Sequence, residues 1–141
     1  MELSELSYGN YIRKKDDKTI WKVVGIDNTG EIKCHNGEVV EQHQIAEYEG
    51  VFASPDILTI CGWDVDSMHA RILTREPNYY AQYYFYGGEL SLYRTFKDER
   101  RNTDFYCISA PGLNYIHELQ NFLKIAIPEK ELITIKLNNK E

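Results

Sequence analysis

The stretch HELQN, at His117–Asn121, is one residue away from H-E-x-x-H, the helical signature of zinc proteases. In that signature the two histidines share one helix face and bind zinc, while the glutamate acts as general base. The fifth position here is Asn121, and amide side chains are poor zinc ligands. The other three histidines have no ligand spacing among themselves or with the cysteines. We therefore interpret His117, Asn121 and Lys124 as the solvated side of an amphipathic helix, and we expect no metal.

Other arrangements that carry enzyme chemistry are missing or weak. The sequence has no G-x-S-x-G, no P-loop and no dinucleotide-binding glycine fingerprint. Cys61 precedes Gly62 at the end of an expected short helix, where a cysteine on the apolar side usually belongs to the core. Asp64 and Asp66 could form a carboxylate pair, but they stand alone in a loop. We expect a protein that is not an enzyme and that uses no cofactor.

Composition limits the remaining classes of protein. The chain has 141 residues, which suits one domain or two small lobes, and its 11 Tyr, 5 Phe and 2 Trp argue against disorder. No apolar run approaches the roughly 20 residues of a membrane helix, and the N-terminus lacks the features of a secretory signal. The three widely spaced cysteines indicate reduced thiols and a cytoplasmic protein. A net charge of −6 disfavours a nucleic-acid binder, which usually has a basic face.

The first half of the chain is predicted to form a small curled sheet. Short segments rich in β-branched and aromatic residues alternate with polar turns, and we expect strands at 11–14, 19–26, 31–35 and 38–45. Asn36-Gly37 favours a type I′ hairpin turn between the last two strands. These features predict an SH3-like sheet or barrel over residues 1–53.

The second half, 54–141, is predicted to be an α+β subdomain. It begins with a short linking helix, 55–61, that has Ser54 as N-cap and Gly62 after its end. We expect antiparallel strands at 69–74, 79–86, 89–96 and 105–109, packed on an amphipathic helix at 113–127. A final strand is expected at 131–137, where apolar and polar residues alternate. At a sheet edge this strand would offer a route to a homodimer.

Several of these stretches, taken together, resemble a known group of sequences. They are YGNYI near the N-terminus, NGEVVEQHQIAEYEGV with the following SPDILTICGW, and the terminal IHELQNFLKIAI and ELITIKL. They are similar to a family of small uncharacterised proteins of Bacteroidetes-type phages, prophages and conjugative elements. The region 64–105 matches nothing in that family, and KIAIPEKEL lacks the glycine expected at the end of the helix. The resemblance implies a mobile-element origin and no activity.

The hairpin at 79–96 is the most unusual feature. Both faces of YYAQYYFY are aromatic, so one must be core while the other could be an exposed tyrosine surface. Aromatic pairs that only stabilise the sheet are one interpretation, and a protein interface is a second. Stacking beside the nearby arginines would also suit single-stranded nucleic acid. The candidate binding residues are Tyr80, Tyr84, Tyr86, Arg94, Arg100 and Arg101.

These observations lead to an expected function. We expect an interaction module that binds a protein encoded by the host or the element, with no membrane association. The alternative is a nucleic-acid-associated protein that uses the small barrel and the aromatic and basic hairpin.

Overall fold

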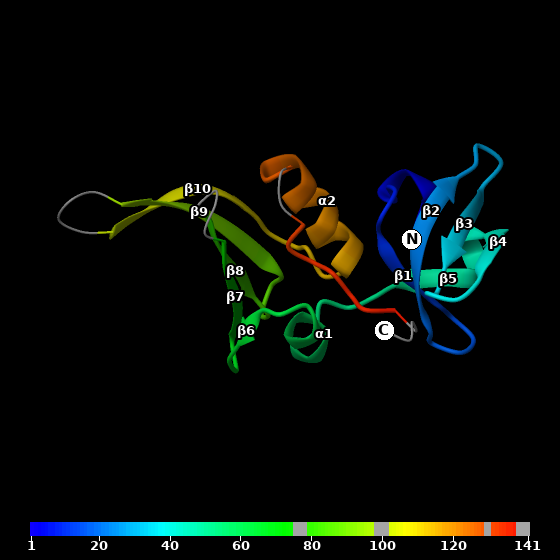
Figure 1. Ribbon diagram of the computed structural model, residues 1–141, viewed down its shortest axis with the longest axis horizontal. Coiled ribbons are helices and arrows are strands. Elements are labelled where there is room, and N and C mark those ends of the chain that lie inside the picture. The colour runs from blue at the N-terminus through cyan, green and yellow to red at the C-terminus, as the bar shows by residue number, and fades with distance from the viewer. Residues whose placement is uncertain (75–78, 98–101, 129–130, 138–141) are drawn as a thin grey trace. The chain divides into compact units, whose positions relative to one another are not determined.

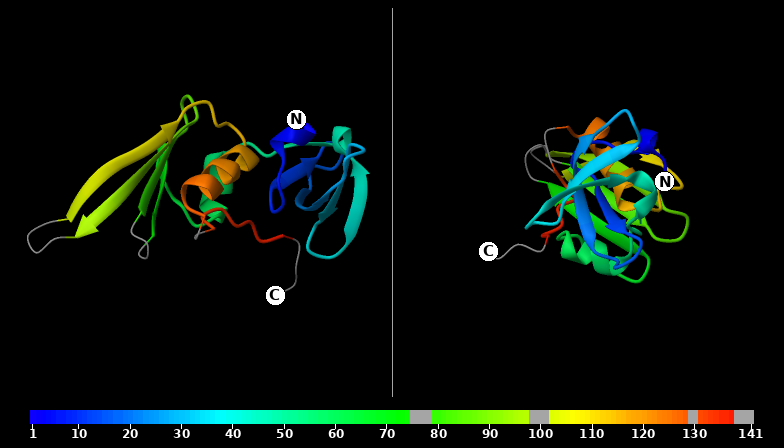
Figure 2. Two further views of the ribbon diagram at one scale, coloured as in Figure 1. Left: turned by 90° about the horizontal axis from the view of Figure 1, so that it is seen from above. Right: turned by 90° about the vertical axis from the view of Figure 1, so that its right-hand side faces the viewer.

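The computed structural model describes residues 1–74, 79–97, 102–128 and 131–137, with the backbone alone for 95–97 and 102–107. The chain divides into two units, of which the first combines Met1–Phe52 with Tyr115–Glu141 and the second is Ala53–Asn114. Each unit contains a five-stranded antiparallel sheet (Figures 1 and 2). The predicted α+β class is confirmed.

The sheet of the first unit is a meander whose last strand returns to its first. Its order is β4-β3-β2-β1-β5. The elements are η1 (Leu3–Glu5), β1 (Tyr11–Lys14), β2 (Ile20–Ile26), β3 (Glu31–His35), β4 (Val40–Gln44), η2 (Ile45–Glu47) and β5 (Tyr48–Gly50). Strands β4 and β5 are the two edges and do not pair within residues 1–52, all of which are described, so this sheet does not close into a barrel.

Alternation along the strands places one face of this sheet in the core. Successive side chains of a strand point to opposite faces, so residues two apart are buried together. In β3, Ile32 and Cys34 are fully buried while Lys33 between them is exposed. The cluster consists of Leu6, Ile12, Trp21, Val23, Ile32, Cys34 and Tyr48.

The hairpin between β3 and β4 is present, but its turn differs from the predicted one. His35 pairs with Val40, so the loop has four residues rather than two. A type I′ turn needs positive φ at both central residues, and here only Gly37 has it, with φ 97°. The Asn36 side chain holds the loop, because its Oδ1 accepts hydrogen bonds from the backbone N–H groups of Glu38 and Val39.

The long helix α2 (Ile116–Ala126) lies where the sequence predicted a helix and ends before Pro128. Ile116, Leu119 and Leu123 form its buried stripe. The helix belongs to the first unit and contacts β1. The predicted assignment of the C-terminal helix to a 54–141 subdomain is therefore wrong, although the first boundary lies next to the predicted one.

The predicted strand at 131–137 is not formed. This described segment has no regular secondary structure, although Leu132, Ile133 and Ile135 are buried. Two adjacent buried residues, 132 and 133, break the two-residue period of a strand. The edge on which the expected homodimer rested is therefore absent from the described residues.

The second unit combines a short helix with a meander sheet. Helix α1 (Pro55–Ile60) starts as predicted, because the Ser54 side chain accepts from the Ile57 N–H, and Gly62 follows the helix with φ 89°. The sheet order is β10-β9-β8-β7-β6. Its strands are β6 (Asp64–Val65), β7 (His69–Thr74), β8 (Tyr79–Tyr84), β9 (Glu89–Lys97) and β10 (Asn102–Ala110). In this helix and at its end, Leu58 is buried, while Ile57 and Cys61 are half-buried.

The 79–96 hairpin is confirmed, with a longer turn than its two glycines suggested. Tyr84 pairs with Glu89, which leaves a loop of four residues, Phe85–Gly88. Gly88 has φ 64°, and a Cβ there would lie 2.6 Å from the Asn114 Oδ1 atom. Glycine is required at this position by both its backbone and its space.

The substitution Gly50→Ala tests the packing of α2 on the first sheet. A Cβ at Gly50 would lie 2.6 Å from Cδ1 of Tyr115 and 3.1 Å from Cε1 of His117, because the residues that begin the helix cover β5. We expect Gly50→Ala to lower the free energy of unfolding by about 1–3 kcal/mol, the usual cost of overpacking. Urea denaturation followed by circular dichroism measures this change. Gly25→Ala is the control, since its Cβ would meet only the Lys33 side chain at 3.1 Å, and equal losses in both variants would contradict the argument.

Candidate binding surfaces

The HELQN stretch faces the protein rather than solvent. His117 is 2% exposed, and Gln120 and Asn121 form hydrogen bonds with residues more than 100 positions earlier in the chain. The interpretation of His117 and Asn121 as part of a solvated helix face is therefore wrong, whereas Lys124 is exposed as predicted. What the helical period could not indicate is that a second, polar side of α2 also packs.

Gln120 joins α2 to the start of β1. Its Nε2 donates to the Gly9 carbonyl oxygen at 2.9 Å, and its Oε1 accepts from the Tyr11 N–H at 2.9 Å. One side-chain amide thus serves a backbone acceptor and a backbone donor on the same segment. This fixes both the position and the register of the N-terminal segment against the helix.

Asn121 completes the connection through the buried Asn10. The Asn121 Oδ1 accepts from Ser7 Oγ at 2.6 Å and from Asn10 Nδ2 at 2.9 Å, and its Nδ2 donates to the Glu5 carbonyl. Asn10 is 2% exposed, and its own Oδ1 accepts from the Ser7 N–H at 2.8 Å. We call Ser7, Asn10, Gln120 and Asn121 the polar clamp.

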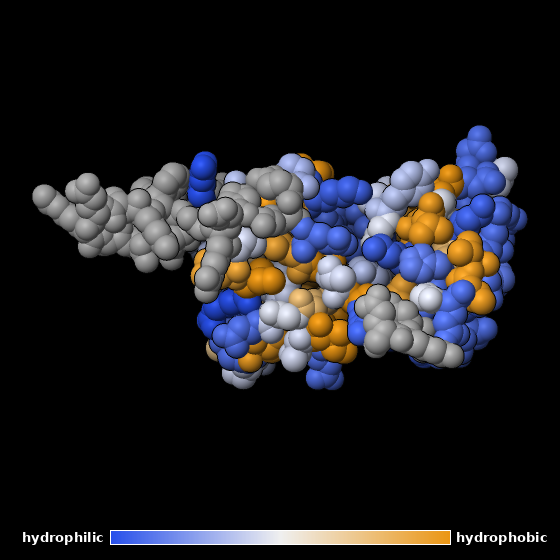
Figure 3. Space-filling model, viewed as in Figure 1, coloured by the Kyte–Doolittle hydropathy of each residue, from blue (hydrophilic) through white to orange (hydrophobic). Residues whose placement is uncertain are grey.

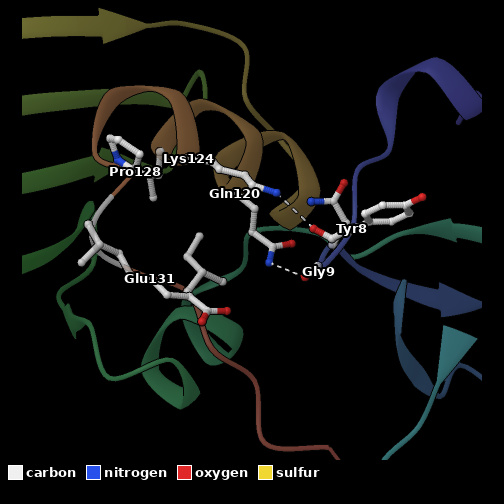
Figure 4. A pocket seen from close by; sticks show the side chains of 10 residues that line it. Tyr8, Gly9, Gln120, Lys124, Pro128 and Glu131 are labelled. Carbon is white, nitrogen blue, oxygen red and sulfur yellow. Dashed lines mark hydrogen bonds between the residues drawn. The ribbon is translucent and has the colours of Figure 1, made fainter. Parts of the chain in front are cut away.

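A pocket of about 400 Å³ lies beside the polar clamp, within the first unit. Figure 4 shows Gln120 and Lys124 reaching from α2 toward Tyr8 and Gly9, with Pro128 and Glu131 on the other side of the hollow. Leu123, Leu132 and Ile133 supply its apolar lining. No pattern in the sequence indicates this pocket, because residues 8–10 and residues 120–133, which form its walls, are far apart in the chain.

His117 is a buried imidazole without a polar partner. Neither ring nitrogen has a hydrogen-bond partner among the residues that the structure describes, and the ring stacks on Tyr115 with 5.8 Å between centroids. Burial lowers the pKa of His117, while the nearby carboxylates of Glu118 and Glu5 oppose that shift. The imidazole is therefore held neutral in an apolar setting.

The thiol of Cys34 and the carboxylate of Asp66 also have structural roles. Burial raises the pKa of the Cys34 thiol to about 11, so this sulfur stays protonated and unreactive. Asp66 accepts from the N–H groups of Met68 and His69 and binds Arg71 at 2.8 Å. These bonds lower the pKa of Asp66 to about 2, so the carboxylate is suited to holding a turn rather than to exchanging protons.

The tyrosines of β8 divide between the two faces of the second sheet. Tyr83 is 2% exposed and Ala81 1%, and they pair across the sheet with the buried Leu90 and Leu92. The opposite face carries the half-buried Tyr80 and Tyr84, with neighbours from β7 and β9. We use the name tyrosine face for its residues His69, Leu73, Tyr80, Tyr84 and Tyr93. The row between Tyr80 and Tyr84 on the same side of the sheet consists of Arg71, Gln82 and Ser91.

Cross-strand contacts order the tyrosine face. Tyr80 pairs with Tyr93 on one side and Leu73 on the other, and the Tyr80 and Tyr93 rings lie 5.8 Å apart. The ring of Tyr84 lies 5.2 Å from that of His69 and 5.7 Å from that of Tyr86 in the following turn. Leu73 is 61% exposed and Tyr86 67%. Sequence reasoning missed His69, Leu73 and Tyr93, although alternation along β7 places the first two on one face.

Among the described residues, the predicted Arg94 does not share the face of these tyrosines. Arg94 is exposed, but it pairs with Tyr79 and therefore shares the face of Ala81 and Tyr83. Arg71 lies on the tyrosine side, where Asp66 binds its guanidinium. Arg100 and Arg101 lie outside the described residues. Of the six predicted binding residues, Tyr80 and Tyr84 share one face of the sheet, and Tyr84 lies beside Tyr86.

The polar clamp is tested by Asn121→Ala. The variant leaves the buried Asn10 amide without its acceptor, and we expect it to lower the free energy of unfolding by about 1–3 kcal/mol. Ile125→Ala on the same helix is the control, because Ile125 is 85% exposed and its truncation should change stability by less than about 0.5 kcal/mol. Thermal and urea denaturation measure both, and an unchanged Asn121→Ala protein would show that the clamp contributes nothing.

Because the pKa of His117 is lowered in the folded protein, we expect the protein to lose stability in mild acid. Its pKa is about 6.5 in the unfolded chain and lower in the folded one, so below that value the unfolded state binds more protons. The stabilisation is complete above about pH 6.5 and is lost as pH falls toward the folded pKa. In His117→Leu the free energy of unfolding should fall less steeply between about pH 7.5 and 5. Parallel slopes for the two proteins would contradict this assignment.

Comparisons with known proteins do not indicate a function, so a function has to be inferred from the surfaces described above. No family model matches the chain, and neither a curated protein nor a solved structure shows significant similarity to it. Within the described residues, no helix is long and apolar enough to cross a membrane. The same residues contain no group of three or more His, Cys, Asp or Glu side chains that could hold a metal ion.

Proposed function

We propose that the chain is a non-enzymatic, cytoplasmic protein-binding module that contacts its partner through the tyrosine face. The resemblance of several stretches along the chain to a family of small proteins of phages, prophages and conjugative elements supports a role as an accessory protein of a mobile element. The single observation that carries the binding proposal is the gathering of half-exposed aromatic rings on one sheet face, continued by the exposed Tyr86.

The physical properties of tyrosine support this use. A tyrosine offers a large apolar body and a polar tip, and tyrosines are enriched at protein interfaces for that reason. Tyr80, Tyr84 and Tyr93 are already ordered by neighbouring side chains, so binding would cost little further side-chain entropy. Elsewhere, in the view of Figure 3, the apolar side chains of the first unit are scattered among hydrophilic ones.

The charges favour a protein partner over nucleic acid. Binding to single strands combines aromatic stacking with cations that follow the phosphates. On the tyrosine side, Asp66 forms an ion pair with Arg71, and Glu89 is the cross-strand neighbour of Tyr84. Arg94 is on the other face, and the net charge of the chain is −6. Nucleic acid therefore has less support as the ligand.

Replacing Tyr84 and Tyr86 by alanine tests the proposal. We expect the double variant to keep its thermal midpoint within a few degrees and to lose its partner, because the side chains are half-buried and exposed, respectively. The measurement is affinity capture from host-cell lysate, read by mass spectrometry, with and without nuclease. A protein captured by the natural chain in both conditions, and lost by the variant, would support the proposal.

The matched control is Val39→Ala with Val40→Ala, which truncates two apolar side chains that are 49% and 60% exposed in the first unit. This variant should retain the partner. Partners that vanish with nuclease would favour the nucleic-acid alternative. Unfolding of the Tyr84 and Tyr86 variant would show instead that these rings belong to the core.

A further inference from the structure

The pocket beside the polar clamp has the size and composition of a small-molecule site. Its volume of about 400 Å³ lies in the range of ligand pockets, which combine an apolar lining with a few oriented polar groups. Leu123, Leu132 and Ile133 have 3%, 8% and 2% of their surface exposed, so the apolar lining is made by well-packed side chains. The walls are thus largely preformed.

Two of the polar lining residues already form hydrogen bonds within the protein through both atoms of their amides. Gln120 uses its amide on Gly9 and Tyr11, and Asn10 uses its amide on Ser7 and Asn121. These residues shape the pocket but have little capacity to bind a ligand. The charged lining residues are Lys124 and Glu131, from different walls (Figure 4).

Lys124 and Glu131 have weak partners. The Lys124 ammonium donates to the Tyr8 carbonyl at 3.3 Å, and no described carboxylate lies within 4.0 Å of it. The Glu131 carboxylate is 63% exposed, and its nearest cation among the described residues is Lys22 at 4.0 Å. A cation and an anion therefore border one pocket of mixed polar and apolar lining without being paired to each other.

We propose that this pocket binds a free α-amino acid with an apolar side chain. Lys124 would accept the ligand carboxylate, Glu131 its ammonium group, and the side chain would lie against Leu123, Leu132 and Ile133. A zwitterion matches both charges, whereas a monocarboxylate or an amine matches one and is opposed by the other. The inference is independent of the tyrosine face, because the pocket belongs to the first unit and that face to the second.

Calorimetry and ligand-observed NMR on the full chain test the proposal with L-leucine as the probe. 4-Methylpentanoate lacks the ammonium group, and L-leucinamide lacks the carboxylate. We expect each to bind about tenfold more weakly than L-leucine, since each loses one charge-assisted hydrogen bond. L-Serine, which lacks the apolar side chain, should not bind measurably. No binding of L-leucine, or equal binding of the three leucine-shaped compounds, would overturn the proposal.

Two variants assign the groups. Lys124→Met should abolish the advantage of L-leucine over L-leucinamide, and Glu131→Gln should abolish its advantage over 4-methylpentanoate. Lys136→Met is the control, because Lys136 is exposed in the same segment and does not line the pocket. Unchanged ligand preferences in both pocket variants would overturn the assignment. The ligand comparison on the natural chain decides the proposal even where a variant folds poorly.

Discussion

The fold of the first unit depends on a buried amide that must be satisfied. Asn10 is almost fully enclosed, and an unpaired amide in such a place costs roughly 1–3 kcal/mol. Asn121, 111 residues later, supplies its acceptor, and Gln120 beside it holds Gly9 and Tyr11. Apolar packing alone would allow a helix to shift or rotate on a sheet. These hydrogen bonds can form in only one position of the helix. The polar clamp therefore explains why residues near both ends of the chain form one unit with a preformed pocket.

Local features of the fold could be predicted from the sequence, because period and turn chemistry act over a few residues. Tyr11–Lys14, Glu31–His35 and His69–Thr74 alternate or carry β-branched residues, and each is a strand with the expected bounds. The cap at Ser54 depends on one side chain and its neighbours. The segment 131–137 has the same alternation, but strand formation also needs an available edge in the right place, and periodicity carries no information about edges.

The candidate surfaces were less predictable, for two different reasons. Both faces of YYAQYYFY are aromatic, so its own pattern could not identify the exposed one. The small Ala81 opposite Leu92, and Tyr83 opposite Leu90, decide the matter in the structure. The packing of HELQN could not be predicted for another reason, because polar residues on a helix usually face water. Only the matching polar segment Ser7–Asn10, far away in sequence, shows that this face is buried.

In the sequence, the second unit is inserted into the first between Phe52 and Tyr115. Phe52 and Tyr115 pair as a β-bridge and stack with 4.9 Å between ring centroids, and the Ile116 N–H donates to the Val51 carbonyl. The inserted segment also begins and ends at bonded neighbours, because the Ala53 N–H donates to Asn114. An insertion whose ends are held together can change inside without altering its host.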